Sequence, residues 1–253
     1  MIIKNILLTG ASSGIGEALA LHYAAQPTTE NLFICGRNEQ RLAEVKRKCE
    51  LAGKAKIHTK LIDVTDKQSM ENWINEAENT AYLNLIFANA GVATLEETPE
   101  NIYNTFNINV MGVLNTVTPA IEIYKKRQDK EKVIAITASI AGYHGLPACP
   151  SYSASKACVK AYGEALRLNL LPHNIQVNTI CPGFVRSRIT DKNTCPMPFF
   201  MEADVAAKLI AKRIEKNVGL ITFPWPMRLI TWLGSILPNC LSDFIYKRLP
   251  YKV

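Results

Sequence analysis

Short apolar runs alternate with longer, mixed stretches along most of the chain. Each run has the length and composition of a buried strand. We expect strands over residues 2–9, 31–35, 56–62, 83–87, 133–137, 175–181 and 219–223. Helices are expected between them from Glu17 onward and over residues 39–51, 67–78, 101–126, 150–171 and 202–217. This alternation predicts an α/β fold, a doubly wound sheet of about seven parallel strands with helices on both faces.

The length suits one large α/β domain as well as two small ones. The 253 residues are 48% apolar, enough for a core, and no linker, internal repeat or low-complexity tract divides them. We therefore expect one domain over residues 1–253, with a C-terminal helical extension at about 225–253. The seven cysteines lack a Cys-x-x-Cys pair and the four histidines lack ligand spacing. Neither disulfides nor a metal site is expected, and the predicted compartment is a reducing cytoplasm.

The net charge of +7 limits the classes of partner. It suits an anionic cofactor or an acidic membrane surface, and it is too diffuse to predict a nucleic-acid partner. The N-terminal apolar run is too short for a signal peptide and leads directly into a glycine turn. No run of eighteen apolar residues occurs, so no helix is expected to span a membrane.

The first strand is followed by a glycine-rich turn, Thr9 to Gly16, and then by a helix. Glycines let the backbone approach a pyrophosphate, and a helix N-terminus offers free N–H groups to it. The spacing is Gly-x-x-x-Gly-x-Gly, with Leu19 where the strict Gly-x-Gly-x-x-Gly pattern has its third glycine. A tight turn without a ligand is the alternative, but the position at the first strand–helix junction favours a phosphate cradle.

The ends of the next three strands carry further candidates for a dinucleotide site. The second strand ends at Gly36-Arg37 without an acid for a ribose 2′-hydroxyl, so Arg37 is a candidate for binding a 2′-phosphate. The alternative is a solvated arginine that caps the following helix. Asp63 could bond the adenine amino group or cap the helix that starts at Lys67. After the fourth strand, small residues at 88–91 leave room for a flat ring.

The stretch from Ser139 to Lys156 contains a candidate proton-transfer group. Ser139 follows a strand, and Pro150 begins a helix on which Tyr152 and Lys156, four residues apart, share a face. The nearby ammonium is expected to lower the pKa of the phenol, so that Tyr152 can exchange a proton with an alcohol or carbonyl. Ser139 would hold the substrate oxygen by a hydrogen bond. A chance helical pair is the alternative for Tyr-x-x-x-Lys taken alone.

In their order and spacing, the motifs resemble those of the short-chain dehydrogenase/reductase family over roughly residues 2–223. They are Thr9-Gly10-x-x-x-Gly14-x-Gly16, Asn89-Ala90-Gly91, Asn109, Ser139, Tyr152-x-x-x-Lys156 and Pro182-Gly183. The resemblance implies a Rossmann-like fold, a nicotinamide cofactor and a catalytic tetrad formed by Asn109, Ser139, Tyr152 and Lys156. It also implies that Tyr152 is the acid/base, that Lys156 holds the nicotinamide ribose, and that Asn109 fixes a relay water.

The same resemblance implies the cofactor contacts. They are Gly10, Ser12, Ser13, Gly14, Ile15, Gly16, Arg37, Asp63, Val64, Asn89, Ala90, Gly91, Tyr152, Lys156, Pro182, Gly183, Val185 and Ser187. Arg37 matches the subtype that prefers NADP(H), which is the expected cofactor.

The sequence departs from the family pattern at Ala88, where an asparagine is usual, and at Ser187, where a threonine is common. It also has Phe223-Pro224-Trp225-Pro226 and a further tail where many members end with an Asp-Gly-Gly turn. The tail argues against the tetramer built through that end, and against an inference to the fatty-acid ketoacyl reductases.

The leading hypothesis is NADP(H)-dependent interconversion of a ketone or aldehyde and an alcohol. A non-catalytic dinucleotide sensor or scaffold on the same fold would predict loss of a tetrad residue, and none is lost. An epimerase or dehydratase of the related extended group would need a longer chain for its substrate domain. Residues after Gly183 predict a lipophilic or bulky substrate, unless several of them are ordinary core. They are Phe184, Ile189, Met197, Phe199, Phe200 and Met201.

Two helices are candidates for contact with larger partners. A stripe of Ala157, Ala161 and Ala165 predicts a homodimer through the helix that starts at Pro150, unless it packs on the chain's own sheet. The tail is predicted to dock on a membrane surface or to close over the substrate site, with packing on its own core or on a second subunit as the alternative. The apolar face of the tail is formed by Leu229, Trp232, Leu233, Ile236 and Leu237. Its basic residues are Arg228, Lys247, Arg248 and Lys252. Its aromatic anchors are Trp225, Trp232 and Tyr246.

Overall fold

The computed structural model describes residues 2–94, 96–129, 131–192, 196–238, 240–241 and 244. They contain one seven-stranded sheet with the order β3-β2-β1-β4-β5-β6-β7, in which every neighbouring pair is parallel. The strands are β1 (Asn5–Thr9), β2 (Asn31–Gly36), β3 (Lys56–Leu61), β4 (Leu85–Ala88), β5 (Lys132–Thr137), β6 (Ile175–Pro182) and β7 (Leu220–Phe223). The doubly wound parallel sheet predicted from the sequence is confirmed.

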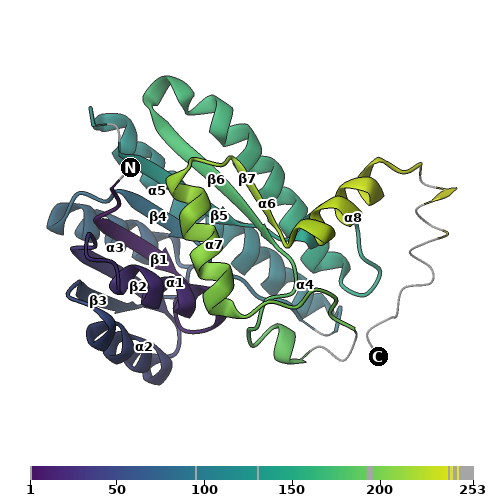
Figure 1. The fold of residues 1–253 in the computed structure, drawn as a ribbon, viewed down its shortest axis with the longest axis horizontal. Helices are drawn as coiled ribbons and strands as arrows, with labels where there is room; N and C mark the ends of the chain where they lie inside the picture. The colour runs from purple at the N-terminus through teal and green to yellow at the C-terminus, as the bar shows by residue number, and fades with distance from the viewer. Residues whose placement is uncertain are drawn as a thin grey trace.

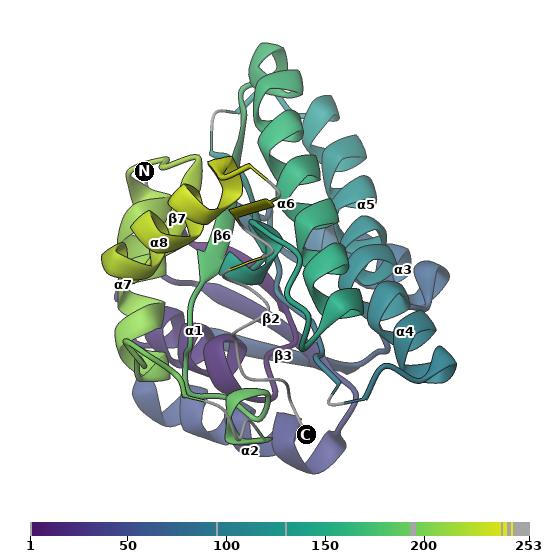
Figure 2. The ribbon, with the colours of Figure 1, turned by 90° about the vertical axis from the view of Figure 1, so that its right-hand side faces the viewer.

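Helices cover both faces of the sheet (Figure 1; Figure 2). The helices on one face are α1 (Gly14–Ala24), α2 (Glu39–Ala52) and α7 (Ala203–Glu215). Those on the other are α3 (Lys67–Thr80), α4 (Pro99–Phe106), α5 (Gly112–Lys126) and α6 (Pro150–Asn169). Helix α8 (Trp225–Ile236) follows β7 and projects from the side of this body (Figure 1).

Burial explains why the strands read as unbroken apolar runs. The central strands β4 and β5 are buried along their whole length, because helices pack on both faces of a parallel sheet. β3 lies at the edge of the sheet and is only partly buried, with Lys56 and Lys60 exposed. Charged side chains on an edge strand hinder its pairing with another sheet.

Several element boundaries differ from the sequence-based expectations. The first strand begins at Asn5 instead of residue 2. A π-helical turn, Asn107–Met111, divides the helix expected over 101–126, and Asn109 lies within that turn. The helix from Pro150 ends at Asn169, before a 3₁₀ turn at Leu171–His173.

The helix caps considered as alternative roles for Arg37 and Asp63 belong to neighbouring residues. Asn38 caps α2 and Asp66 caps α3, each through a side-chain oxygen that accepts a backbone N–H of the first turn. Both capping alternatives are therefore wrong. The side chains of Arg37 and Asp63 contact each other instead.

Within the described part of the chain, no helix is both long enough and apolar enough to cross a bilayer. The same residues contain no group of three or more His, Cys, Asp or Glu side chains that could hold a metal ion. Of the predicted membrane-facing residues of the tail, Tyr246, Lys247, Arg248 and Lys252 lie outside the described residues.

Candidate active site

The predicted site residues gather at the carboxyl ends of the strands, around the point where the chain reverses its direction across the sheet. This point lies between β1 and β4, which are neighbours although two other strands separate them in sequence. In open parallel sheets the ends of such strands diverge and leave a crevice for a ligand.

Asn89 ties the strand ends together at this crevice. Its amide nitrogen donates to the carbonyls of Thr9 at 3.2 Å and Gly10 at 3.3 Å, and its amide oxygen accepts from the Thr137 hydroxyl at 3.2 Å. The Thr9 hydroxyl in turn accepts from the backbone N–H groups of Asn89 at 3.0 Å and Ala90 at 3.2 Å. The side chain predicted to touch the cofactor thus holds β1, β4 and β5 in register, a role that sequence spacing did not indicate.

The glycine turn requires its glycines for steric reasons. Gly10 has φ +66° and Gly14 has φ +59°, a backbone region that side-chain-bearing residues rarely adopt. A Cβ at Gly10 would lie 2.7 Å from the Cα of Ala90, and one at Gly16 would overlap the carbonyl of Gly10. α1 begins at Gly14, and Ser13 in front of it makes no side-chain cap. The N–H groups of its first turn are therefore oriented to bind an anion, which fits a pyrophosphate.

The segment after β6 closes this side of the crevice. A Cβ on Gly14 would lie 2.8 Å from the Cβ of Ser187, so the two segments are in close contact. The Ser187 N–H donates to the Thr190 hydroxyl at 2.8 Å, and Val185 is buried where it pairs with Met201. Of the predicted contacts in this segment, Ser187 thus adjoins the glycine turn, whereas Gly183 lies against Pro224 and Ile140.

Arg37 and Asp63 meet at the ends of β2 and β3. The Arg37 Nη1 lies 3.3 Å from the Asp63 Oδ2, with both side chains partly exposed. Burial opposes ionisation of Asp63, but hydrogen bonds from Thr65 and the charge of Arg37 outweigh it and lower the pKa of the carboxyl. The adjacent Val64 carbonyl accepts from the Asn115 side chain at 2.9 Å, which anchors this end of β3 to α5.

Arg41 is a site residue that the sequence analysis missed. It lies on the first turn of α2, and its Nε is buried without a hydrogen-bond partner among the described residues. Together with Ser12, Ser13 and Gly14 it lines a cavity of about 490 Å³ beside the glycine turn. An unpaired guanidinium nitrogen beside an anion-binding turn fits a phosphate-bearing ligand. Its place on the first turn of the helix that directly follows β2 was the available signal, because that turn lies near the same strand end.

Lys156 and Asn109 converge beside Gly91. Lys156 is buried, and its Nζ donates to the Thr137 carbonyl at 2.9 Å. Asn109 is fully buried in the π-helical turn. Its amide oxygen accepts from the Val92 N–H, and its amide nitrogen donates to the Val92 carbonyl. A Cβ on Gly91 would lie 3.2 Å from both the Asn109 Oδ1 and the Lys156 Nζ. A larger residue at position 91 would therefore crowd both groups.

Tyr152 and Ser139 lie at the same end of the sheet. Ser139 is buried after β5, and its Oγ accepts from the Ala141 N–H at 3.1 Å. The Lys156 Nζ lies 5.9 Å from the centre of the Tyr152 ring. The structure thus brings together all four residues that the resemblance assigned to the tetrad, from the π-helical turn Asn107–Met111, the end of β5 and α6.

The expected lowering of the phenol pKa is wrong for this structure. Burial raises the pKa of Tyr152 to about 12, and a hydrogen bond with Ser139 offsets only part of that rise. Burial also lowers the pKa of Lys156 to about 8. Both pKa values shift in the direction of the neutral form because the surrounding protein solvates charge poorly. The expectation from the sequence took account of the effect of the Lys156 ammonium on the phenol pKa, but not of the larger effect of burial on both residues.

The N-terminus of α6 is fixed by a carboxylate from a distant segment. Glu97 accepts from the Ser151 N–H at 3.2 Å and from the Ser151 hydroxyl at 2.8 Å. The preceding residue in the cap position, Cys149, makes no side-chain cap. Glu97 therefore positions the helix that carries Tyr152 and Lys156, and no feature of the local sequence indicated this.

Comparison with known proteins assigns the family. The family profile described as short chain dehydrogenase matches residues 4–196. The chain belongs to the short-chain dehydrogenase family. It is 33% identical to an uncharacterized oxidoreductase of Myxococcus xanthus (strain DK1622), with 98% of each chain covered. It is 29% identical to the 11-beta-hydroxysteroid dehydrogenase-like protein 4A of Arabidopsis thaliana, covering 94% of this chain and 82% of that protein.

Solved structures share the fold of this short-chain dehydrogenase. A short-chain dehydrogenase/reductase from Burkholderia phymatum in complex with NAD superposes with a TM-score of 0.82 at 23% identity. One from Sphingobium yanoikuyae in complex with NADPH gives 0.80 at 21% identity, and each comparison covers 98% of this chain and 97% of the other. The protein is therefore an oxidoreductase of this family with a Rossmann-like fold.

Proposed function

We propose that this short-chain dehydrogenase interconverts a ketone or aldehyde and an alcohol with NADP(H), using Tyr152 as the general acid/base. The observation that carries the proposal is the convergence of Lys156 and Asn109 beside Gly91, at the strand ends where Tyr152 and Ser139 also lie. The glycine turn and the Arg41 Nε, which has no hydrogen-bond partner among the described residues, fit a phosphate-bearing dinucleotide. When bound, the reduced cofactor supplies the hydride and its oxidised form accepts one.

The protonation states favour carbonyl reduction at neutral pH. With a pKa of about 12, Tyr152 keeps its phenolic proton and can donate it to a developing alkoxide. The Ser139 Oγ accepts from the Ala141 N–H, and Ser139 is hydrogen-bonded to Tyr152, so both hydroxyls can turn toward one substrate oxygen. Ser139 thus orients the oxygen and Tyr152 supplies the proton.

Lys156 restores the proton of Tyr152 after each turnover. Its pKa of about 8 leaves it mostly protonated at neutral pH and able to exchange that proton readily. Asn109 lies on the side of Lys156 next to Gly91, where a water held by the amide oxygen would link the ammonium to solvent. The hydrogen bond to the Thr137 carbonyl keeps the ammonium in place.

The preference for NADP(H) rests on the arginines at the end of β2. Arg37 lies at this strand end, Arg41 lines the adjoining cavity, and the strand ends in Gly36-Arg37 instead of an acid for a ribose 2′-hydroxyl. A Cβ on Gly36 would lie 3.3 Å from the Ser12 side chain, so the hydroxyl of Ser12 adjoins the same point. Two guanidinium groups and a hydroxyl form a suitable binding site for a 2′-phosphate.

The substrate is proposed to be a lipophilic carbonyl compound or alcohol. Phe199 and Phe200 are exposed on the segment that follows the site, next to the bridge between the buried Val185 and the half-buried Met201. One relative is named for 11-beta-hydroxysteroid dehydrogenase, an activity on a large apolar molecule. Apolar walls bind such molecules by removing their surface from water.

A homodimer through α6 is proposed as the assembly. Ala157, Ala161 and Ala165 are exposed, so the alternative that this stripe packs on the chain's own sheet is wrong. Small residues on an exposed helix face let a second helix approach closely.

The test of the proposed function is an absorbance assay of NADPH consumption with a panel of ketones and aldehydes that range from small and polar to large and apolar. We expect turnover with at least the apolar members, and none with the Tyr152→Phe variant. Binding of NADPH without turnover of any carbonyl or alcohol would support a dinucleotide sensor instead.

A further inference from the structure

Helix α8 exposes nearly all of its apolar side chains. Within α8 only Met227 is buried, at 9% exposure. Apolar side chains that are 45% to 76% exposed are Trp225, Leu229, Ile230, Trp232, Leu233 and Ile236. The described residues beyond α8 continue the pattern, with Leu241 at 51% and Phe244 at 60% exposure. Packing of α8 on the chain's own core, one alternative considered from the sequence, is therefore wrong.

The exposed side chains form one face that points away from the protein. At about 100° per residue along an α-helix, five of them fall within a sector roughly 100° wide. They are Trp225, Leu229, Trp232, Leu233 and Ile236. Met227, which packs onto the body, lies on the opposite side of the helix. Arg228, Thr231 and Ser235 occupy a polar flank between the two.

The charges of this segment favour an acidic surface over a second copy of the chain. α8 contains Arg228 and no acidic residue, and residues 225–253 contain four basic residues and one acidic residue. Two copies joined through this segment would bring like charges together, whereas anionic lipid headgroups would attract them. The net charge of +7 adds to that attraction.

The aromatic residues and the length of α8 fit the interface of a bilayer rather than its interior. Trp225 and Trp232 both lie on the exposed face, and indole rings favour the headgroup level of a membrane. The helix has 12 residues and is therefore about 18 Å long, which is too short to span a hydrocarbon core of about 30 Å.

α8 is attached at the rim of the candidate active site. Its cap residue Pro224 packs against Gly183, where a Cβ would lie 3.0 Å from the proline Cδ. α8 also contacts the turn Ile140–Gly142, which directly follows Ser139. A surface bound to α8 would therefore lie next to the strand ends that carry the proposed site (Figure 1).

We propose that α8 docks this protein on the surface of an anionic lipid bilayer. The outward face inserts its indole and aliphatic side chains at the headgroup level, and Arg228 lies against the lipid phosphates or carboxylates. Docking does not depend on catalysis. Where the proposed function also holds, docking presents the site to lipophilic molecules in the bilayer.

The experiment is co-sedimentation of the full-length protein with vesicles of phosphatidylcholine and phosphatidylserine in equal parts, and with vesicles of phosphatidylcholine alone. We expect binding to the mixed vesicles, weakened by high salt because the charge attraction is screened. Replacement of both exposed indoles by serine, Trp225→Ser with Trp232→Ser, should weaken binding by about tenfold or more. The matched control is Leu51→Ser with Tyr82→Ser, which removes side chains that are 76% and 72% exposed elsewhere on the surface.

Tryptophan emission gives a second measurement that needs no variant. Trp73 is buried, so a blue shift on adding vesicles would arise from Trp225 and Trp232. Absence of both sedimentation and a blue shift for the wild type overturns the proposal, as does undiminished binding by the double indole variant with its circular dichroism unchanged. Conversion of a dimer to a monomer by that variant without vesicles also overturns it, because α8 would then belong to a subunit interface. A protein that binds vesicles but turns over no carbonyl keeps the docking proposal and refutes only the proposed function.

Discussion

The two ionisable residues of the proposed tetrad respond to the same burial in opposite directions. The pKa of Tyr152 rises to about 12 and that of Lys156 falls to about 8, because each neutral form is favoured where charge is poorly solvated. At neutral pH the phenol is therefore a proton donor, and the ammonium remains charged but exchanges its proton easily. This combination suits reduction of a carbonyl better than oxidation of an alcohol.

Replacement of Tyr152 by phenylalanine tests the proton donor. We expect the kcat for carbonyl reduction to fall by more than ~10²–10⁴, because the variant loses the only proton donor assigned to the substrate oxygen. Cofactor affinity, measured by fluorescence titration, should stay nearly unchanged because the ring remains. A variant that kept more than a tenth of the wild-type kcat would show that Tyr152 is not the acid.

The pH profile tests Lys156. The kcat/KM for carbonyl reduction should be level below about pH 8 and should decline above it, as the Lys156 ammonium loses its proton while Tyr152 is still protonated. Lys160→Met is the matched control, since Lys160 lies one helical turn further along α6 and pairs with Glu164. Its profile should match that of the wild type. A rate that stayed level well above the pKa of Lys156 would contradict the proposed role.

Arg37 and Arg41 are predicted to select NADPH over NADH. A charge-assisted hydrogen bond to the 2′-phosphate contributes ~1.5–3 kcal/mol, so Arg37→Ala and Arg41→Ala should each lower kcat/KM for NADPH by roughly 10- to 100-fold. The values for NADH should change little. Arg47→Ala, an exposed arginine on the same helix, is the control. Equal use of both cofactors by the wild type would refute the preference.

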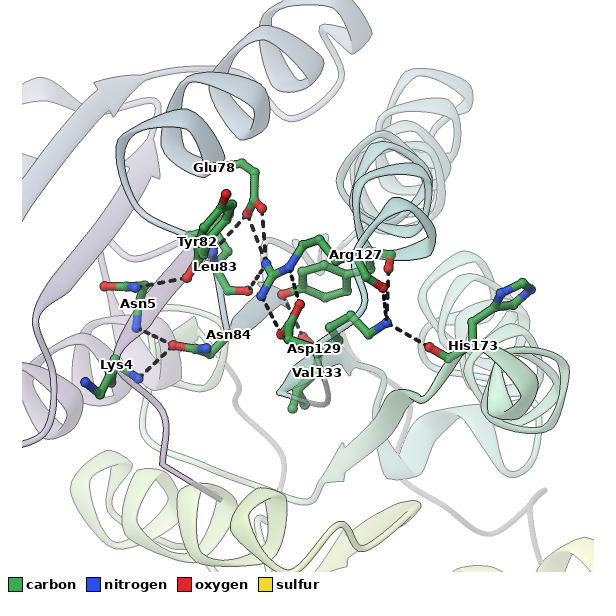
Figure 3. A network of polar contacts seen from close by, with 12 residues as sticks. Lys4, Asn5, Glu78, Tyr82, Leu83, Asn84, Arg127, Asp129, Val133 and His173 are labelled. Carbon is green, nitrogen blue, oxygen red and sulfur yellow. Dashed lines mark hydrogen bonds and ion pairs between the residues drawn. The ribbon is translucent and has the colours of Figure 1, made fainter.

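At the scale of elements, a polar network joins α3, α5 and β5 at the amino-terminal ends of the central strands (Figure 3). Arg127 lies at its centre and donates to the Leu83 carbonyl at 2.7 Å, to Asp129 at 2.7 Å and to Glu78 at 3.1 Å. Beside it, the buried Lys132 donates to backbone carbonyls at the end of α5 and in the turn Leu171–His173. These carbonyls belong to Tyr124, Arg127 and His173.

Lys132 is predicted to stabilise the fold without a part in catalysis. Lys132→Met would leave three carbonyl groups without their charged donor and should lower the free energy of unfolding by about 2–4 kcal/mol. Urea denaturation followed by circular dichroism measures this. Lys126→Met removes an exposed lysine near the end of α5 and should have almost no effect. An unchanged midpoint for Lys132→Met would mean that water replaces the ammonium at no cost.

The exposed alanine stripe of α6 is predicted to form the dimer interface. Light scattering should give the mass of two chains for the wild type and of one chain for Ala161→Arg, because a long charged side chain prevents close approach of two helices. Ala52→Arg, at the exposed end of α2, is the control and should remain a dimer. A monomeric wild type at micromolar concentration would exclude this interface.

At the scale of the whole molecule, the single parallel sheet places the proposed functional groups at the carboxyl ends of its strands. The crevice between β1 and β4 collects the glycine turn and Asn89, while β5 and α6 supply Ser139, Tyr152 and Lys156. The polar network of Arg127 and Lys132 lies at the amino-terminal ends of the strands (Figure 3). The residues of this network and the residues of the proposed active site thus lie at opposite ends of the strands.

The sequence by itself determined the elements, their order and the motif residues. Strands buried on both faces need continuous apolar runs, and turns such as the one at Gly10 and Gly14 need glycine, so both features are written locally in the chain. This is why the parallel sheet and the glycine turn could be predicted from the sequence, whereas the proposed tetrad rests on the resemblance of its motifs to those of the family. The caps at Asn38 and Asp66 show the limit of local reading, because several adjacent residues could have served.

Only the tertiary structure decided the features that depend on residues far apart in the chain. The burial that raises the pKa of Tyr152, the amide of Asn89 that joins three strands, and the hold of Glu97 on α6 all arise from packing. The outward orientation of the apolar face of α8 is of the same kind. Amphipathic spacing shows which side chains share a face, but the direction in which that face points is set by what the rest of the fold leaves uncovered.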